Sequence, residues 1–264
     1  MYRLSWQIYL TLLKLFIPVF LIIFMLDYVF ISKTLFFPKQ GILAIGDLHI
    51  GYEDMLIQLG VTIPKTQTKE TIEELKEIFK EIKKRKYSLK KIIFLGDIKH
   101  YFGFEKAEFF EFRDILDFLK ENFEEKDIIF IRGNHDKFDM SGIKMLDYYI
   151  EDSIAFSHGH KSFPEIYDKK IKTIVISHIH PAVALSDKQG IKTEKFRCFL
   201  TGKFKGKEII VVPHFFNLSD GTDVREIYSL PDFFIIPSKI LKDFEIHVVG
   251  KDKIYNFGKV GRLK

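Results

Sequence analysis

Five short polar clusters hold most of the residues in this chain that could do chemistry. They contain aspartate, asparagine and histidine, and seven of the nine histidines lie in or just after them. Each cluster follows an apolar run of strand length, which predicts polar loops at the ends of buried strands. With their apolar runs, the five stretches are Ile42–His49, Ile92–Asp97, Asp127–Asp136, Ile154–His160 and Ile174–His180.

Seven side chains of these clusters are candidate metal ligands, namely Asp47, His49, Asp97, Asn134, His158, His178 and His180. Oxygen and imidazole donors suit manganese, iron, zinc or similar borderline metals. The single Cys198 excludes a multi-cysteine zinc site and an intramolecular disulfide. Asp47 and His49 are two residues apart, so they point to the same side of an extended segment, and the histidine pair of the last cluster has the same spacing.

The number of these ligands indicates two metal ions. Seven are too many for one open catalytic ion, but they suit two ions that share a carboxylate. Two ions roughly 3.5–4 Å apart can bridge a hydroxide and clamp a phosphoryl oxygen for in-line attack. The clusters therefore predict metal-assisted hydrolysis of a phosphate ester.

The segments between the clusters predict the elements that position them. Thr71 to Lys86 has apolar residues at helical spacing, with Thr71 and Glu74 placed as a capping box, and a second helix is expected near Lys106 to Asn122. Alternating strands and helices up to His180 predict layered α/β packing. Beyond Pro181 we expect a second sheet, because four strand-like runs occur there without a long helix. They are Phe196–Leu200, Glu208–Val212, Phe244–Val249 and Lys253–Phe257.

The first 28 residues differ from the rest, so we expect an apolar segment at 1–28 and one catalytic domain at 29–264. Ile8 to Leu26 is close to the ~20 apolar residues of a membrane helix. Two interpretations stay open: an uncleaved single-pass anchor in the membrane, or a translation start placed too far upstream of Met25. In either case the catalytic domain is expected in the cytoplasm, and the oligomeric state is left open.

The order of the motifs resembles that of the calcineurin-like metallophosphoesterases. Asp-x-His, Gly-Asp, Gly-Asn-His-Asp, His-Gly-His and His-x-His follow one another over residues 42–181. Within that superfamily, Gly46–Glu53 together with Gly96–His100 is similar to the archaeal SbcD-related phosphoesterases. The resemblance implies a four-layer αββα sandwich of two mixed β-sheets flanked by helices.

The resemblance also implies a role for each ligand. Asp97 would bridge two divalent ions, Mn²⁺ by preference with iron, zinc or nickel as alternatives. The first ion would be held by Asp47, His49 and His180, and the second by Asn134, His158 and His178.

Four further residues of the clusters would surround the metals. His135 would contact the phosphate or protonate the leaving oxygen, and Asp136 would orient it. His100 resembles a histidine that holds the scissile phosphate in related nucleases. His160 is expected to be a neighbour of the ligands and not a ligand itself. Outside the clusters, His214 and His247 are interpreted as packing or surface histidines.

Two departures from the family pattern bear on the substrate and the last loop. Position 100 is histidine where aspartate is common, as in nuclease-like members. The last motif begins with Ser177 where glycine is common, and because serine is small we expect the loop to be retained.

The substrate is expected to be a phosphodiester, with nucleic acid as one candidate. Lys99 and His100 stand where phosphatases of the superfamily often have arginine, which a dianionic monoester favours. The net charge of +5 permits a phosphate-bearing partner without requiring one, and we find no aromatic and basic platform for stacking bases. The alternatives are a phosphomonoesterase or a cyclic-nucleotide phosphodiesterase, and a non-catalytic metal-bound interaction module, against which the retention of His135 argues.

Overall fold

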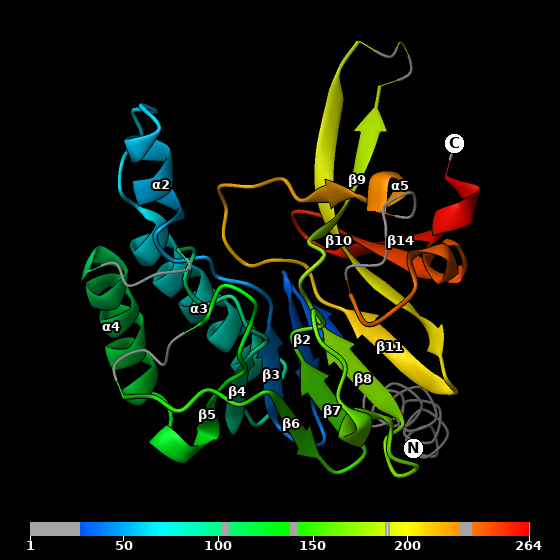
Figure 1. The fold of residues 1–264 in the computed structure, drawn as a ribbon, viewed down its shortest axis with the longest axis horizontal. Coiled ribbons are helices and arrows are strands. Elements are labelled where there is room, and N and C mark those ends of the chain that lie inside the picture. Colours follow the sequence, from blue (N-terminus) through cyan, green and yellow to red (C-terminus); the bar gives the residue numbers. More distant parts are fainter. Residues whose placement is uncertain are drawn as a thin grey trace, which may run out of the picture.

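The computed structural model describes residues 27–101, 106–137, 142–187, 189, 191–227 and 234–263 of the chain. Two β-sheets pack against each other, and helices cover the outer face of the first sheet (Figure 1). This arrangement of two mixed sheets flanked by helices confirms the predicted α/β sandwich. The predicted segment at residues 1–28 falls almost wholly outside the described residues. Within the described ones, no helix has the length and apolar character needed to cross a membrane.

The first sheet has five strands in chain order. β1, β2 and β3 are antiparallel, whereas β3, β4 and β5 are parallel. The strands are β1 (Val29–Ile31), β2 (Thr34–Phe37), β3 (Ile42–Ile45), β4 (Lys91–Phe94) and β5 (Ile128–Phe130). Two long helices, α3 (Gln67–Lys84) and α4 (Lys106–Lys120), pack on its outer face, and the short α2 (Tyr52–Gln58) precedes them.

The second sheet has nine strands and is also mixed. Its central order is β12-β9-β10-β11-β8-β7-β6, and β13 joins it by pairing with β10 and β14. The strands are β6 (Tyr148–Glu151), β7 (Ile154–Ser157), β8 (Thr173–Ile176), β9 (Pro181–Ser186), β10 (Thr193–Phe204), β11 (Lys207–Val211), β12 (Thr222–Asp223), β13 (Glu245–Val249) and β14 (Ile254–Lys259). The short helices are η1 (Glu125–Asp127), η2 (Pro164–Tyr167), α5 (Val224–Ile227), η3 (Ser238–Asp243) and η4 (Val260–Arg262).

Alternation along each strand explains how both faces of a sheet are buried. In β3, Leu43 and Ile45 pack toward α3 and α4, whereas Ile42 and Ala44 pack toward the second sheet. Successive strand residues point to opposite faces, so an uninterrupted apolar run serves two cores at once. The apolar runs before the polar clusters are therefore strands buried on both sides.

Two of the sequence-based boundaries were wrong. The helix expected from Thr71 begins at Gln67, because the buried Glu53 accepts hydrogen bonds from the backbone N–H groups of Thr66 (2.8 Å) and Gln67 (2.9 Å). Thr71 is buried inside the helix and cannot be its cap. The second sheet was expected after Pro181, but it also contains β6, β7 and β8.

A substitution between the two sheets should destabilise the protein more than one at the surface. Phe199 is fully buried between the sheets and stacks on Phe30 with ring centroids 4.2 Å apart. We expect Phe199→Ala to lower the free energy of unfolding by about 3–5 kcal/mol, measured by urea denaturation. The control Phe257→Ala removes a ring that is 41% exposed and should change it by less than about 1 kcal/mol. Equal losses at both positions would contradict this assignment of the core.

Candidate metal centre

All five polar clusters lie at the carboxyl ends of strands. The loops after β3, β4 and β5 come from the first sheet, and those after β7 and β8 come from the second. Carboxyl ends of parallel strands form the edge where open α/β sheets place their ligands. The predicted convergence of separate loops is thus present in the structure.

Among the described residues, three groups of side chains could hold a metal ion. One consists of His49, His100 and His135, and the other two are the ligand sets of the predicted centre. Within each set, one ligand atom per residue lies within 4.8 Å of the others. One set is Asp47, His49 and His180, and the other is Asp97, His158 and His178. The first matches the residues expected at the first ion. The second contains the expected bridging aspartate and two of the three residues expected at the second ion.

Asn134, the remaining expected ligand, lies beside the second set. Its amide oxygen is 3.1 Å from Nε2 of His158. That ring is oriented by its other nitrogen, because Nδ1 donates a hydrogen bond to the carbonyl of Leu95 at 2.9 Å. A partner that fixes the far nitrogen is typical of a metal-binding histidine.

Asp97 lies between the two sets. Its Oδ2 is 3.4 Å from Nε2 of His158 and 3.8 Å from Nε2 of His49. Gly133 makes room for this carboxylate, since a Cβ on Gly133 would lie 2.0 Å from Oδ1 of Asp97. Asp97 therefore reaches both sets, as a bridging ligand must.

The charges of the site fit a divalent cation. Asp47 and Asp97 are 0% and 2% exposed. Burial raises the pKa of each carboxyl, but His158 and the other neighbouring histidines together outweigh burial, so that the pKa of Asp97 falls to about 2 and that of Asp47 lies well below its usual range. Burial lowers the pKa of His49 to about 3 and that of His178 to about 4. Ionised carboxylates beside neutral His49 and His178 are the protonation states that metal binding requires. Burial lowers the pKa of His158, but the carboxylates of Asp47 and Asp97 raise it to about 9, so this ring must release a proton before it binds a metal.

Four candidate ligands have an unusual backbone conformation. His49, Asp97, His178 and His180 have φ values of 44°, 47°, 73° and 45°. Non-glycine residues seldom adopt positive φ, and such strain costs about 1–3 kcal/mol per residue and concentrates at functional sites. Four of the eight described non-glycine residues with positive φ are thus candidate ligands.

Hydrogen bonds from outside the ligand sets hold these strained loops. Gln67 of α3 donates to the carbonyls of Leu48 and His49, both at 2.9 Å. The backbone N–H of Thr222 donates to the carbonyl of His180 at 2.8 Å. Ser177, which replaces the usual glycine, donates its hydroxyl to Asp47. The loop is retained, as predicted, and it gains a contact to a candidate ligand.

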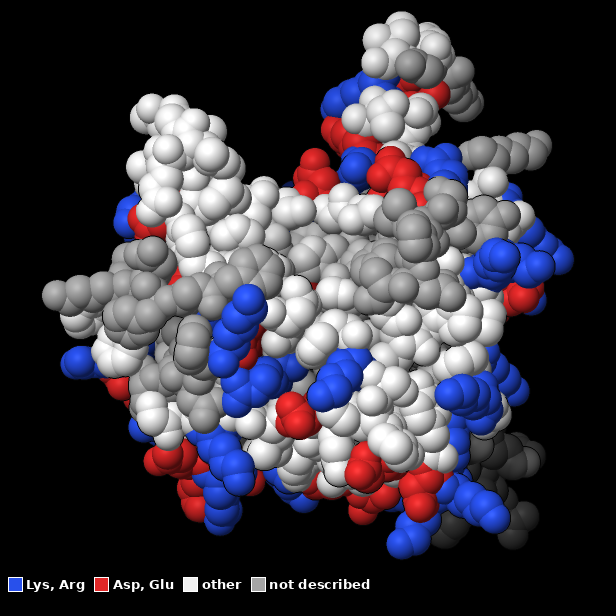
Figure 2. Space-filling view, in the orientation of Figure 1, with Lys and Arg blue, Asp and Glu red and all other residues white. Residues whose placement is uncertain are grey.

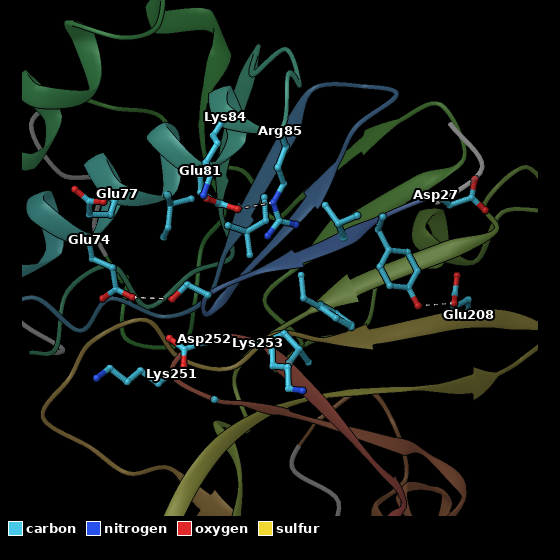
Figure 3. Close-up of a pocket in the computed structure, with 18 residues that line it drawn as sticks. Asp27, Glu74, Glu77, Glu81, Lys84, Arg85, Glu208, Lys251, Asp252 and Lys253 are labelled. Atoms are coloured by element: carbon cyan, nitrogen blue, oxygen red, sulfur yellow. Dashed lines mark hydrogen bonds and ion pairs between the residues drawn. The ribbon is translucent and has the colours of Figure 1, made fainter. Parts of the chain in front are cut away.

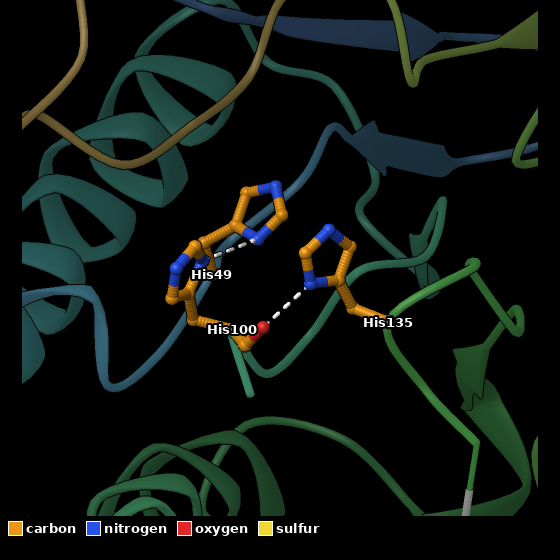
Figure 4. A group of neighbouring side chains, drawn as sticks. All are labelled: His49, His100 and His135. Atoms are coloured by element: carbon orange, nitrogen blue, oxygen red, sulfur yellow. Dashed lines mark hydrogen bonds between the residues drawn. The ribbon is translucent and has the colours of Figure 1, made fainter. Parts of the chain in front are cut away.

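His135 and His100 lie on one side of the ligand sets, and Figure 4 shows their rings beside His49. Nδ1 of His135 is 2.5 Å from the carbonyl of His100, so this nitrogen carries the hydrogen. The two rings stack with centroids 5.5 Å apart, and Nδ1 of His100 is 3.4 Å from Nδ1 of His49. Both residues therefore reach the space next to the first ligand set.

The contacts of Asp136 differ from the expected ones. Its buried carboxylate accepts hydrogen bonds from the backbone N–H groups of Gly133 (2.9 Å), Ile98 (3.1 Å) and Lys99 (3.3 Å). Burial and the charge of Asp97 raise its pKa to about 6. Asp136 therefore joins the loops that carry Asp97 and Asn134, while the ring of His135 is held by a backbone carbonyl.

Three histidines remain, and two of them lie near the candidate ligands. The ring of His160 is 5.1 Å from that of His158, and its Nδ1 has no hydrogen-bond partner among the described residues. His247 packs in β13, bonded to Thr201 at 2.8 Å. His214 packs with 0% exposure, but against the site: its ring is 4.8 Å from that of His180.

The loop that contains His214 is the part of the site that sequence reasoning missed. It follows β11, and its Phe215 N–H donates to the carbonyl of Asp47 at 2.8 Å. Arg197 of β10 donates to Nε2 of His214 at 2.7 Å and to the carbonyl of Phe216 at 3.0 Å. A usable signal was present, because an apolar run followed by Pro213 and His214 repeats the plan of the other five clusters.

A separate groove lies between β1, α3 and the β13–β14 hairpin (Figure 3), and none of the candidate ligands is among the described residues that line it. Its volume is about 990 Å³. Charges of both signs line it, including Glu81 and Arg85, which pair at 2.8 Å. None of the groups of described residues that could hold a metal ion lies in this groove.

Comparison with known proteins places the chain in a family. A family model of the calcineurin-like phosphoesterases matches residues 41–249, so the chain belongs to that family. The crystal structure of nuclease MPE from Pseudomonas putida is similar, with a TM-score of 0.55 and 18% sequence identity over 85% of this chain and 91% of that chain.

Two other solved structures align with this chain over most of their own length. A conserved uncharacterized protein from Streptococcus pneumoniae TIGR4, described as a predicted phosphoesterase, has a TM-score of 0.34 and 11% identity, over 88% of this chain and 100% of that one. Vps29 from Entamoeba histolytica, complexed with zinc, has a TM-score of 0.34 and 13% identity, over 81% and 96%. No curated protein matches the chain.

Removal of the Asp97 carboxylate, which lies near both ligand sets, should disrupt both candidate ion sites. We expect Asp97→Asn to weaken Mn²⁺ binding by at least about 100-fold, because changes to partners outside the ligand sets alone cost 10–100-fold. Calorimetric titration of the metal-free chain measures this loss. The control Asp117→Asn changes an aspartate whose side chain is 65% exposed and should bind metal like the wild type. Unchanged binding by the Asp97 variant would contradict its place in the centre.

Proposed function

We propose that the chain is a metal-dependent phosphodiesterase with a dinuclear centre, and that its substrates are nucleic acids. The observation that carries this proposal is the position of Asp97, whose Oδ2 lies within 3.8 Å of a histidine from each ligand set. Membership of the calcineurin-like phosphoesterase family supports phosphate-ester hydrolysis.

The residues fit two divalent ions. Asp47, His49 and His180 would hold one ion, Asn134, His158 and His178 would hold the other, and Asp97 would belong to both. Such ions supply an activated water and neutralise charge on the phosphoryl oxygens, and Mn²⁺ suits the mixed oxygen and imidazole donors.

The chain itself supplies a proton donor. The hydrogen bond from Nδ1 of His135 to the carbonyl of His100 fixes the orientation of the ring. In the protonated form, Nε2 carries the second hydrogen and would donate it to the leaving oxygen. His100, stacked against this ring, would contact the phosphate from the same side.

The basic residues near the site favour a diester. Lys99 is 3% exposed and donates to the carbonyl of Tyr101, and Arg132 donates to the carbonyl of Asp136 at 2.9 Å. Burial, reinforced by the charge of His135, lowers the pKa of His100 to about 4, so this imidazole is neutral near pH 7. Since the described side chains of Lys99 and Arg132 are engaged with backbone carbonyls, the site suits a monoanionic diester better than a dianionic monoester.

Two likenesses support nucleic acid as the substrate class. The Pseudomonas putida structure with the same fold is a nuclease. In addition, Gly46–Glu53 and Gly96–His100 resemble the motifs of the archaeal SbcD-related phosphoesterases, in which position 100 is histidine.

A direct comparison of esters tests the activity. With Mn²⁺, we expect the full chain to hydrolyse bis(4-nitrophenyl) phosphate with a kcat/KM at least about tenfold above that for 4-nitrophenyl phosphate, because the described lysine and arginine side chains nearest the site bond to backbone carbonyls and a second phosphate charge favours additional cations. Release of 4-nitrophenol measures both. The reverse order would favour a phosphomonoesterase. Preferred cleavage of a cyclic nucleotide over single- and double-stranded DNA and RNA would favour a cyclic-nucleotide phosphodiesterase, and no metal-dependent hydrolysis would favour an interaction module.

Variants of Asn134 and His135 should separate metal binding from turnover. We expect His135→Ala to keep the wild-type metal content while kcat falls by about 10²–10⁴-fold, whereas Asn134→Ala should lose one ion. Metal analysis after gel filtration and steady-state kinetics measure the two effects. Because 4-nitrophenolate leaves without protonation, the loss in His135→Ala should be smaller for an aryl diester than for a dinucleotide. Full activity of the variant on both substrates would refute the role.

A further inference from the structure

We propose that Tyr52, supported by Phe216, forms the binding surface for a nucleobase next to the scissile phosphate. This inference rests on the proposed phosphodiesterase function and specifies which part of the substrate the chain recognises. The two aromatic residues are far apart in the sequence, and the ring centroids are 5.2 Å apart in the structure.

Tyr52 is the accessible member of the pair. It is the first residue of α2, three positions after His49, and its ring is partly exposed. The ring lies 4.8 Å from that of His100 at an interplanar angle of 68°, so Tyr52 stands at the side of the proposed phosphate site. Its backbone N–H donates to the carbonyl of His49 at 3.1 Å, which ties its position to that of a candidate ligand.

The turn before Tyr52 is rigidly placed. Gly51 has a φ of +87°, and a Cβ there would lie 2.5 Å from the side chain of Glu108. Glu108 is 1% exposed and accepts hydrogen bonds from the backbone N–H groups of His100 (3.0 Å) and Tyr101 (2.8 Å). One buried carboxylate therefore fixes His100 and the turn that directs Tyr52 toward it.

Phe216 forms the back of the surface. It is 3% exposed, and its ring lies 5.1 Å from that of His49 and 5.9 Å from that of His180. Cations from both sheets hold its loop. Arg197 donates to the carbonyl of Phe216 at 3.0 Å, and the buried Lys33 donates to the side chain of Asn217 at 2.8 Å. Phe216 thus supports the neighbouring rings and leaves Tyr52 to meet the substrate.

The surroundings leave room for a polymer on both sides. α2 begins at Tyr52, and β9 begins directly after His180. Figures 1 and 2 show α2 and the β9–β10 hairpin projecting as two arms with a hollow between them. A partly exposed aromatic ring at the base of one arm can stack on any base, because every base has a π-face. A sugar or an alkyl group has no π-face to stack, so a diester with a planar base gains the most from this ring.

Dinucleotides that lack one base test the inference. The full chain with Mn²⁺ is assayed on thymidylyl-thymidine and on two analogues in which a tetrahydrofuran residue replaces either the 5′ or the 3′ nucleoside. We expect removal of the base on one side to lower kcat/KM roughly tenfold in the wild type, the size expected for one base–aromatic contact. Tyr52→Leu should abolish this preference, and Tyr52→Phe, which keeps the ring, should retain it.

The control is Tyr255→Leu, which changes a tyrosine that is 44% exposed on β14, and it should behave as the wild type. The ratio between two substrates of the same variant is independent of the fraction of folded protein. Equal rates on all three dinucleotides in the wild type, or an unchanged preference in Tyr52→Leu, would overturn the role of Tyr52 while the phosphodiesterase stands. No cleavage of dinucleotides alongside hydrolysis of bis(4-nitrophenyl) phosphate would overturn the nucleobase surface and the nucleic-acid substrate while the phosphodiesterase stands, and hydrolysis of no diester would overturn both proposals.

Discussion

Two buried carboxylates impose the constraint that the rest of this site satisfies. Asp47 and Asp97 have almost no contact with solvent, and both lie close to His158, whose Nδ1 is 3.6 Å from Asp47. Burying ionised groups is costly unless cations or hydrogen bonds compensate them. The surrounding imidazoles, the hydroxyl of Ser177 and the backbone N–H of His135 (2.9 Å from Asp97) provide part of that compensation. Divalent cations fit the remainder, because carboxylate oxygens and imidazole nitrogens, the donor types that such ions bind, face one another.

The need to hold these ligands in place explains why buried side chains around the site hydrogen-bond to the backbone of the ligand loops. A ligand loop with positive φ relaxes unless neighbouring groups hold it. Gln67 holds the loop of His49, Glu108 holds that of His100, and Asp136 joins those of Asp97 and Asn134. These three side chains are buried and bond to backbone groups. The helices on the first sheet therefore do more than cover a core, since α3 and α4 carry two of the residues that fix the ligand loops.

The centre was predictable to the extent that its residues follow apolar runs. Strands end where apolar sequence ends, and parallel strands bring those ends to one edge, so seven candidate ligands could be gathered from five loops without coordinates. Sheet membership was less predictable, because a run such as Ile154–Ser157 carries no mark of the sheet it joins. The contact of Asp136 was missed for a related reason: backbone N–H groups of distant loops leave no pattern in the sequence.

Aromatic residues near the site were the hardest to interpret. Tyr52 and Phe216 look like the many other aromatic residues of this chain, and only the fold brings them together beside His49. His214 repeated the plan of the five clusters, yet its partner Arg197 lies in the middle of a long strand, where an exposed role is the usual expectation. Residue spacing in the sequence does not predict long-range contacts between common residue types such as aromatics. It does predict a site when rare residue types such as histidine cluster after apolar runs.

The division of ligands between the sheets links metal binding to the fold itself. Asp47 and His49 come from the first sheet and His180 from the second, while Asp97 comes from the first and its partners His158 and His178 from the second. Neither sheet alone holds a complete set. An ion bound at either position would join the two halves of the sandwich, and a ligand that binds only the folded state adds to its stability. The loop after β11 also connects the two sheets, without a metal, because the backbone N–H of Phe215 donates a hydrogen bond to the carbonyl of Asp47.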